Sequence, residues 1–210
     1  MSATATAQGG GGHAGRKALP PDAFFGAATS GKIGMWIFLL SDGFSFAGLL
    51  LAYGILRGGA RVWRHEGEPQ LGIHFTAGLT FLLICSSLSM VLAVTAAHEG
   101  RRRAVMGWLG LTALGGGLFL AGQAHEYFGL VGQGLVQQGL VLGRSAYAST
   151  FYVITSFHGL HVLTGTLYIL VVLGRTAADR ADANEVEILG LFWHFVDLVW
   201  ILVFTFVYLL

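Results

Sequence analysis

Five stretches of the sequence are each long and apolar enough to cross a lipid bilayer as an α-helix. A helix needs about 20 mostly apolar residues to span the hydrocarbon core of a membrane. The predicted spans cover about residues 31–56, 73–97, 104–128, 146–173 and 186–210. The connections between them are short, and they are polar or rich in glycine. The sequence therefore predicts an all-α integral membrane bundle of five transmembrane helices, with no second folded domain.

The charge content agrees with a chain that lies mostly in lipid. Only 11% of the residues are charged and 54% are hydrophobic, whereas a soluble domain has about a quarter of its residues charged. The formal net charge of +1 gives no basic field for nucleic acid, so we expect no nucleic-acid partner. A single cysteine, Cys85, excludes an intrachain disulfide and a cysteine-based metal cluster, and we expect its side chain to be buried.

The N-terminal residues have a different composition from the rest of the chain. Residues 1–15 are rich in Ala, Thr and Gly and contain no apolar segment of the kind found in a signal peptide. We therefore expect residues 1–30 to be a disordered cytoplasmic tail. Residues 31–210 then form the five-helix membrane domain, and the first span has to direct membrane insertion.

Lysine and arginine are distributed unequally between the two sides of the predicted bundle. The N-terminal side holds eight, namely Arg16, Lys17, Lys32, Arg101, Arg102, Arg103, Arg175 and Arg180. The opposite side holds four, namely Arg57, Arg61, Arg64 and Arg144. Because short basic loops are retained in the cytoplasm, this distribution predicts a cytoplasmic N-terminus and a C-terminus outside the cytoplasm.

Several ionisable residues fall at membrane depth, where such side chains usually face the interior of a bundle. They are Asp42, His125, Glu126, His158, His161, His194 and Asp197. His158 and His161 are three residues apart, as are His194 and Asp197, so each pair shares one helix face. Spacing alone leaves three interpretations open: polar contacts that fix helix packing, a metal or haem site, and proton handling or subunit contact. Two histidines three residues apart cannot occupy both axial positions of one haem.

Asp42 stands apart because no basic residue lies within one helical turn of it in the sequence. An unpaired buried carboxyl favours the neutral acid. Two interpretations remain open. Asp42 is either a proton relay that ionises in turn, or a neutral acid that donates one hydrogen bond to a neighbouring helix.

Two segments resemble the paired signatures of subunit III of the haem–copper terminal oxidases. Residues 157–165 match its Phe-His-Gly-x-His-Val-x-x-Gly motif, and residues 187–200 match its Glu followed by Trp-His-Phe-Val-Asp-x-Val-Trp. The matching positions are Phe157, His158, Gly159, His161, Gly165, Glu187, Trp193, His194, Asp197 and Trp200. Further matches are Ser86, Ser87, Gln123, Glu126 and Tyr127. The resemblance covers residues 32–210.

Two features distinguish this sequence within the family. It resembles the five-helix bacterial form, which lacks the first two helices of the seven-helix form. In the seven-helix form, lipids lie in the cleft between those two helices and the other five, and how that cleft is completed in the five-helix form is left open. Ser41 and Asp42 stand where many members have Ser-Glu, and that glutamate is the family's carbodiimide-reactive acid. Aspartate keeps the carboxyl group but shortens its reach by one methylene.

The resemblance implies a role without a redox centre. Subunit III of the family carries no haem or copper and has no catalytic residue. It packs on subunit I, sustains proton uptake, protects the enzyme during turnover and binds lipid. Asp42 is then the proton-related candidate. The other ionisable groups are expected to form a buried polar network, namely His125, Glu126, His158, His161, Glu187, His194 and Asp197.

The resemblance therefore predicts a non-catalytic subunit of a bacterial respiratory oxidase, which couples oxygen reduction to proton translocation in the inner membrane. Its expected partners are subunit I above all, subunit II, other oxidase subunits and phospholipid, and a respiratory supercomplex remains open. Haem and copper would lie in the partner subunits. Alternatives are a subunit III-like component of a nitric-oxide reductase, or a membrane cytochrome with its own haem. The sequence does not distinguish cytochrome c from a quinol as the electron donor.

Overall fold

The structure is a computed structural model that describes residues 29–64, 68–69, 71–129 and 132–210. Its helices are α1 (Ser30–Gly59), α2 (Ile73–His98), α3 (Arg102–Phe128), α4 (Ala146–Ala177) and α5 (Ala183–Val203), and a π-helix, η1 (Phe204–Leu209), continues α5. All five spans are long and apolar enough to cross a membrane. The predicted fold class is therefore confirmed. Most of the expected tail, residues 1–30, lies outside the described residues, and α1 already begins at Ser30.

Local signals at the helix ends explain several of the observed boundaries. Ser145 precedes α4 and its hydroxyl accepts a hydrogen bond from the Ala148 amide, 3.1 Å away. The Asp182 carboxylate caps α5 in the same way. Such side chains satisfy amide groups that have no partner inside the helix. At the end of α3, Gly129 adopts a left-handed conformation with φ 61°, which glycine accepts without a steric cost.

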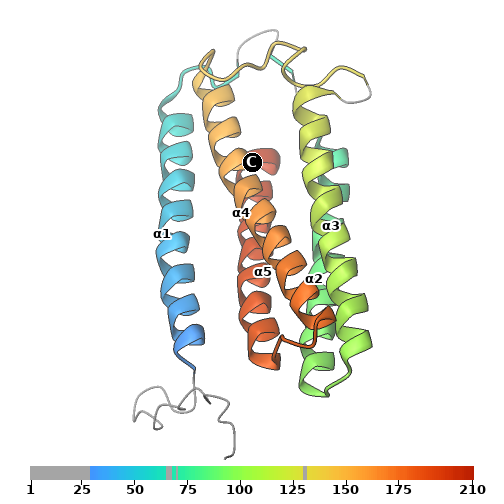
Figure 1. The fold of residues 1–210 in the computed structure, drawn as a ribbon. Helices are drawn as coiled ribbons and strands as arrows, with labels where there is room; N and C mark the ends of the chain where they lie inside the picture. The colour runs from blue at the N-terminus through green and yellow to red at the C-terminus, as the bar shows by residue number, and fades with distance from the viewer. Residues whose placement is uncertain (1–28, 65–67, 70, 130–131) are drawn as a thin grey trace, which may run out of the picture.

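The helices form an antiparallel bundle in which α5 contacts α1, α2 and α4 (Figure 1). The most extensive contacts join α2 to α3 and α3 to α4. Helix α1 stands at the edge of the bundle in Figure 1 and contacts mainly α5 and α4. Its buried residues form one narrow stripe, which consists of Leu39, Asp42, Phe46 and Tyr53. The stripe leaves most of the α1 surface for lipid or for another subunit.

Large apolar side chains cover the outside of the bundle as well as its interior, unlike in a soluble protein. On α1, Trp36, Phe44 and Leu51 are each more than 60% exposed. The interior in contrast includes the fully buried polar residues Thr155 and His158. A lipid solvent accepts apolar side chains on the outside, whereas polar side chains at membrane depth usually face the interior of the bundle.

Candidate functional site

Asp42 on α1 pairs with His161 on α4. The Oδ1 atom of Asp42 lies 3.2 Å from Nε2 of His161, and the two side chains are 10% and 13% exposed. Nδ1 of His161 lies 2.7 Å from the Phe157 carbonyl oxygen. The expectation that Asp42 is unpaired is therefore wrong, because its partner comes from a helix more than a hundred residues away in the sequence.

The two contacts of His161 constrain where protons reside. A carbonyl oxygen can only accept, so Nδ1 of His161 carries a hydrogen that it donates to Phe157. The contact between Nε2 and Asp42 then holds a single proton. Either neutral Asp42 donates to neutral His161, or protonated His161 donates to the carboxylate. Both arrangements have no net charge, so the pair can hold this proton without leaving a net charge in the bundle.

Aromatic rings surround this pair. The Phe46 and Phe157 rings lie edge-on to the His161 ring, with centroid distances of 5.2 and 4.8 Å. The second carboxyl oxygen of Asp42, Oδ2, is buried and has no hydrogen bond with the described residues. The contact with His161 is therefore the polar contact that the Asp42 carboxyl group makes with the described residues.

His158 has quite different surroundings from His161, although both lie on α4. It is fully buried, and neither ring nitrogen has a hydrogen-bond partner among the described residues. Its ring stacks at 4.7 Å on Trp200 with an interplanar angle of 32°, and Phe119 lies edge-on to it at 5.7 Å. The structure therefore places His158 in an aromatic core rather than in a polar network.

Two neighbouring serines connect α2 to α5. The Ser86 hydroxyl accepts a hydrogen bond from Nε1 of Trp193, 3.2 Å away. The Ser87 hydroxyl lies 2.6 Å from Nδ1 of His194. All four residues belong to the motifs that carry the family resemblance. Their contacts set the register between the two helices.

Asp197 lies close to this contact, but its carboxyl group has fewer hydrogen bonds than these residues have. Its side chain is buried, and neither carboxyl oxygen has a hydrogen bond with the described residues, although Ser87 is nearby. One helical turn further along α5, Nε1 of Trp200 donates to the Thr80 hydroxyl at 2.9 Å. Asp197 and His194 lie on the same helix, but they are not hydrogen-bonded to each other: His194 bonds to Ser87.

Gln123 and Tyr127 join α3 to α4. Nε2 of Gln123 donates to the Thr155 carbonyl oxygen at 2.7 Å and to the Tyr127 hydroxyl at 3.0 Å. The Tyr127 hydroxyl in turn lies 2.5 Å from the Thr155 hydroxyl. A Cβ atom at Gly159 would lie 2.5 Å from Oε1 of Gln123, so this close approach requires glycine. At Gly165, a Cβ atom would lie 3.0 Å from Trp193.

Glu126 accepts two hydrogen bonds near one end of the bundle. Its carboxylate accepts from the Thr76 hydroxyl at 3.1 Å and from the Tyr208 hydroxyl at 3.0 Å, so it connects α2, α3 and η1. The adjacent His125 lies edge-on to the Phe75 ring at 5.6 Å. Sequence reasoning did not identify Thr76 or Tyr208, because a single threonine or tyrosine in an apolar helix carries no spacing signal.

Glu187 lies at the opposite end of the bundle. Its carboxylate is 2.7 Å from Nζ of Lys32 and 3.6 Å from Nε2 of His98, and its side chain is 31% exposed. The structure therefore places Glu187 in a partly exposed ionic cluster between α1, α2 and α5. It does not lie among the buried polar groups where the sequence analysis put it.

The polar residues thus occupy several separate helix interfaces instead of meeting in one place. Within the described part of the chain, no group of three or more His, Cys, Asp or Glu side chains converges as metal ligands would. Cys85, expected to be buried, is exposed on the surface of the bundle. The contacts can hold helices in register, and the Asp42–His161 pair can hold a proton.

Comparisons with known proteins agree with the motifs. A family model described as cytochrome c oxidase subunit III matches residues 25–210. Cytochrome c oxidase subunit 3 of Synechocystis is 40% identical over 181 residues, which are 84% of this chain and 74% of the relative. The Corynebacterium diphtheriae protein of the same name is 37% identical over 84% of this chain and 86% of its own length.

A third relative has a different electron donor in its name. Cytochrome bo(3) ubiquinol oxidase subunit 3 of Pseudomonas putida is 33% identical over 181 residues, which are 85% of this chain and 84% of the relative. Similarity therefore extends to oxidases named for cytochrome c and for ubiquinol alike. The resemblance noted in the sequence is confirmed, and the chain belongs to the subunit III family of the haem–copper oxidases.

Proposed function

We propose that this chain is the non-catalytic third subunit of a bacterial respiratory oxidase that couples oxygen reduction to proton translocation. In this proposal it packs mainly on subunit I, and subunit II, other oxidase subunits and phospholipid complete its surroundings. Haem and copper belong to the partner subunits. The observation that carries the proposal is the family match over residues 25–210, which includes both signature segments. The relatives are named as oxidase subunits, which favours this function over a nitric-oxide reductase component or a haem-carrying cytochrome.

The proposed location is the bacterial cytoplasmic membrane, with the N-terminus in the cytoplasm. Lys32, Arg102 and Arg175 lie at the end of the bundle where α1 begins, and Arg57 lies at the other end (Figure 1). The excess of basic residues at the first end supports this orientation.

The Asp42–His161 pair is the proposed contribution of this chain to proton uptake and turnover stability. It is the described ion pair with the most buried partners, and it lies on the edge helix α1, most of whose surface is exposed. A carboxyl oxygen and an imidazole nitrogen can each donate or accept a hydrogen bond, so such a pair can hold one proton between its two partners. We propose that this pair keeps the edge helix in place while the neighbouring catalytic subunit cycles.

Purification of the chain with its native partners tests the proposal. We expect a reduced-minus-oxidised spectrum of the complex to show the haems of a haem–copper oxidase, and mass spectrometry to identify subunits I and II. The isolated chain should show no haem signal. Haem retained by the isolated chain, or co-purification with a partner that lacks the oxidase copper site, would overturn the proposed function.

A further inference from the structure

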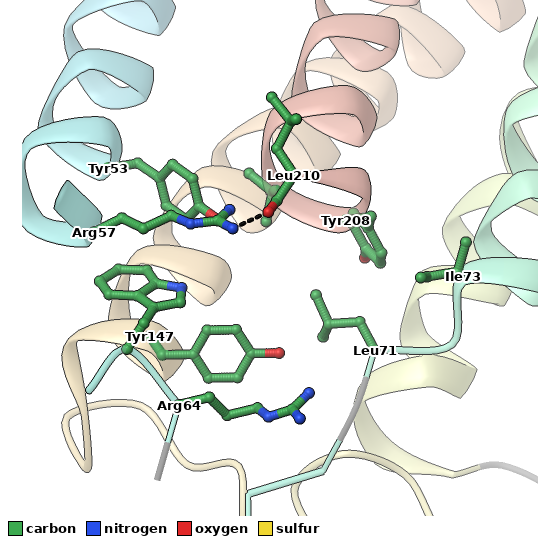
Figure 2. Close-up of a pocket in the computed structure, with 10 residues that line it drawn as sticks. Tyr53, Arg57, Arg64, Leu71, Ile73, Tyr147, Tyr208 and Leu210 are labelled. Atoms are coloured by element: carbon green, nitrogen blue, oxygen red, sulfur yellow. Dashed lines mark hydrogen bonds between the residues drawn. The ribbon is translucent and has the colours of Figure 1, made fainter. Parts of the chain in front are cut away.

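A cavity of about 350 Å³ lies at the end of the bundle where α1 ends and α4 begins. It is bordered by the end of η1 and by Trp63, Arg64 and Leu71, which lie between α1 and α2. The polar and aromatic residues that line it are Tyr53, Arg57, Trp63, Arg64, Tyr147 and Tyr208 (Figure 2). None of these residues belongs to the family motifs, and the candidate site above uses only Tyr208 among them.

The two arginines of the cavity differ in whether their guanidinium groups already have hydrogen-bond partners. Nη1 of Arg57 donates to the Tyr53 hydroxyl at 3.0 Å, and Nη2 donates to the carbonyl oxygen of Leu210. Arg64 has no hydrogen bond or ion pair with any other described residue, and its side chain is exposed. Figure 2 shows the Arg64 guanidinium reaching into the same space as the Tyr147 hydroxyl. Among the described residues, Arg64 therefore provides a cation without a hydrogen-bond or ion-pair partner, and it can be reached from outside.

Tyr147 provides an independent sign of a ligand. Its side chain is only 7% exposed, yet no hydrogen bond joins its hydroxyl to the described residues. The hydroxyl points into the cavity in Figure 2. Trp63 holds the ring edge-on at 6.0 Å. The Tyr147 hydroxyl is a donor without a hydrogen-bond partner among the described residues, at the cavity end of an otherwise buried side chain. Together with the nearby Arg64 guanidinium, it fits an oxyanion that accepts from both.

The described acidic residues near the cavity already have interactions of their own. Glu126 already accepts hydrogen bonds from the Tyr208 and Thr76 hydroxyls, and it is not one of the residues that line the cavity. Glu68 is also near Tyr147, but it has an interaction of its own. Of the described residues that line the cavity, Arg64 is therefore the one whose charge is not engaged by a hydrogen bond or an ion pair.

The walls of the cavity indicate which kind of oxyanion fits. Leu71, Ile73 and Val207 supply apolar surface beside the polar groups. Trp63 and the tyrosines lie at the end of the membrane spans, the depth at which aromatic side chains and lipid headgroups meet. Arginine forms a planar fork that matches phosphate oxygens. We propose that this cavity binds the phosphate group of a phospholipid from the leaflet at the C-terminal end of the bundle.

The inference rests on the proposed association with phospholipid and assigns a headgroup site to it. Native mass spectrometry of the tagged full chain, with whatever subunits co-purify, tests it after delipidation and addition of short-chain phosphatidylglycerol. Arg64→Gln should weaken binding by about tenfold or more, since a charged hydrogen bond is lost. Arg61→Gln is the matched control, because Arg61 is an exposed arginine in the same connection and does not line the cavity.

A second variant covers the case in which Arg64→Gln prevents folding. Tyr147→Phe removes the unpartnered hydroxyl, keeps the ring against Trp63, and should also weaken binding. Equal binding by the wild type and by both variants would overturn the inference. Inorganic phosphate that binds as tightly as the lipid, or short-chain diacylglycerol that binds equally well, would overturn a phospholipid headgroup as the ligand. The haem spectrum of the same sample reports separately whether the chain is in an oxidase.

Discussion

At the scale of single residues, two histidines one helical turn apart have opposite environments. His161 uses both ring nitrogens, one for the Phe157 carbonyl and one for Asp42. His158 uses neither and is surrounded by aromatic rings. Both histidine rings lie near Phe46 of α1. His161 also meets Asp42 of α1, whereas His158 packs against Phe119 of α3 and Trp200 of α5. His158 and His161 therefore have different hydrogen bonding although both belong to the same family motif.

Substitution of Asp42 should separate packing from proton handling. Asp42→Ala leaves Nε2 of His161 without its partner, which costs about 1–3 kcal/mol of local stability. We expect the assembled oxidase to keep a near-normal initial rate but to lose activity sooner during continuous turnover. Asp42→Asn can still donate a hydrogen bond to Nε2 but cannot exchange a proton.

The asparagine variant therefore decides between the two interpretations of Asp42. Inactivation as fast as in the alanine variant would support proton handling, whereas wild-type behaviour would support a hydrogen bond alone. Ser41→Ala is the control, because the Ser41 hydroxyl is exposed and bonds only within its own helix. An alanine variant at position 42 that assembles normally and inactivates at the wild-type rate would rule out a role beyond packing.

His158 should tolerate an apolar replacement. It has no hydrogen bond to lose among the described residues, and leucine has a similar volume, so His158→Leu should change the stability by less than about 1.5 kcal/mol in either direction. Gln123→Leu in contrast removes an amide that serves two acceptors and should cost about 1–3 kcal/mol. Thermal unfolding in detergent, with size-exclusion chromatography as the readout, measures the stability of both variants. A large loss in the leucine variant at position 158 would show that this ring has an unseen polar partner.

At the scale of helices, small residues allow the backbones to approach where polar groups and tryptophans interlock. Trp193 on α5 lies against Gly116 of α3 and Gly165 of α4, while its ring nitrogen reaches Ser86 on α2. One side chain thus contacts three other helices. Because lipid offers little hydrophobic drive for association between helices, close packing of this kind supplies much of the stability.

The run of three glycines in α3 provides a matched test of this packing. A Cβ atom at Gly116 would lie 2.5 Å from the Thr166 hydroxyl and 2.7 Å from the Trp193 ring, whereas a Cβ atom at Gly117 would have no neighbour within 4 Å. Gly116→Ala should therefore destabilise the bundle by about 1–3 kcal/mol. Gly117→Ala should be neutral or slightly stabilising. Thermal unfolding in detergent compares them, and equal unfolding temperatures would contradict the close contact.

At the scale of the whole molecule, the bundle has ends with different chemistry. The end where α1 begins contains Lys32, Glu187 and His98 in one ionic cluster, together with the arginines at the start of α3. The end where the chain finishes contains fewer basic residues and the aromatic cavity. This difference in charge is the physical basis for the proposed orientation in the membrane.

Cysteine accessibility in intact cells measures that orientation. In a Cys85→Ser background, Gln138→Cys and Ala178→Cys each place one thiol in an exposed connection at opposite ends of the bundle. A membrane-impermeant maleimide applied from outside should label the variant at position 138 in intact cells. It should label the variant at position 178 only after lysis. The reverse pattern would invert the proposed topology.

The number of helices, their approximate limits and the family could be predicted from the sequence because they depend on local properties. Hydropathy over about 20 residues reports a span directly, and the two long motifs lie within continuous helices. The predicted limits are close to the observed ones, with α4 extending to Ala177 beyond the expected residue 173. Helix caps such as Ser145 and Asp182 are local signals of the same kind.

The partners of the polar side chains could not be predicted in this way, because each partner lies on a different helix. Asp42 looks unpaired along its own helix, and it meets His161 only through the packing of α1 against α4. Helical spacing likewise suggested one polar network, but the rotation of each helix distributes its members among separate interfaces. Burial of Cys85 was expected from an apolar run, and the helix turned it outward. Spacing within a helix determines which residues share a face, and packing between helices determines what that face meets.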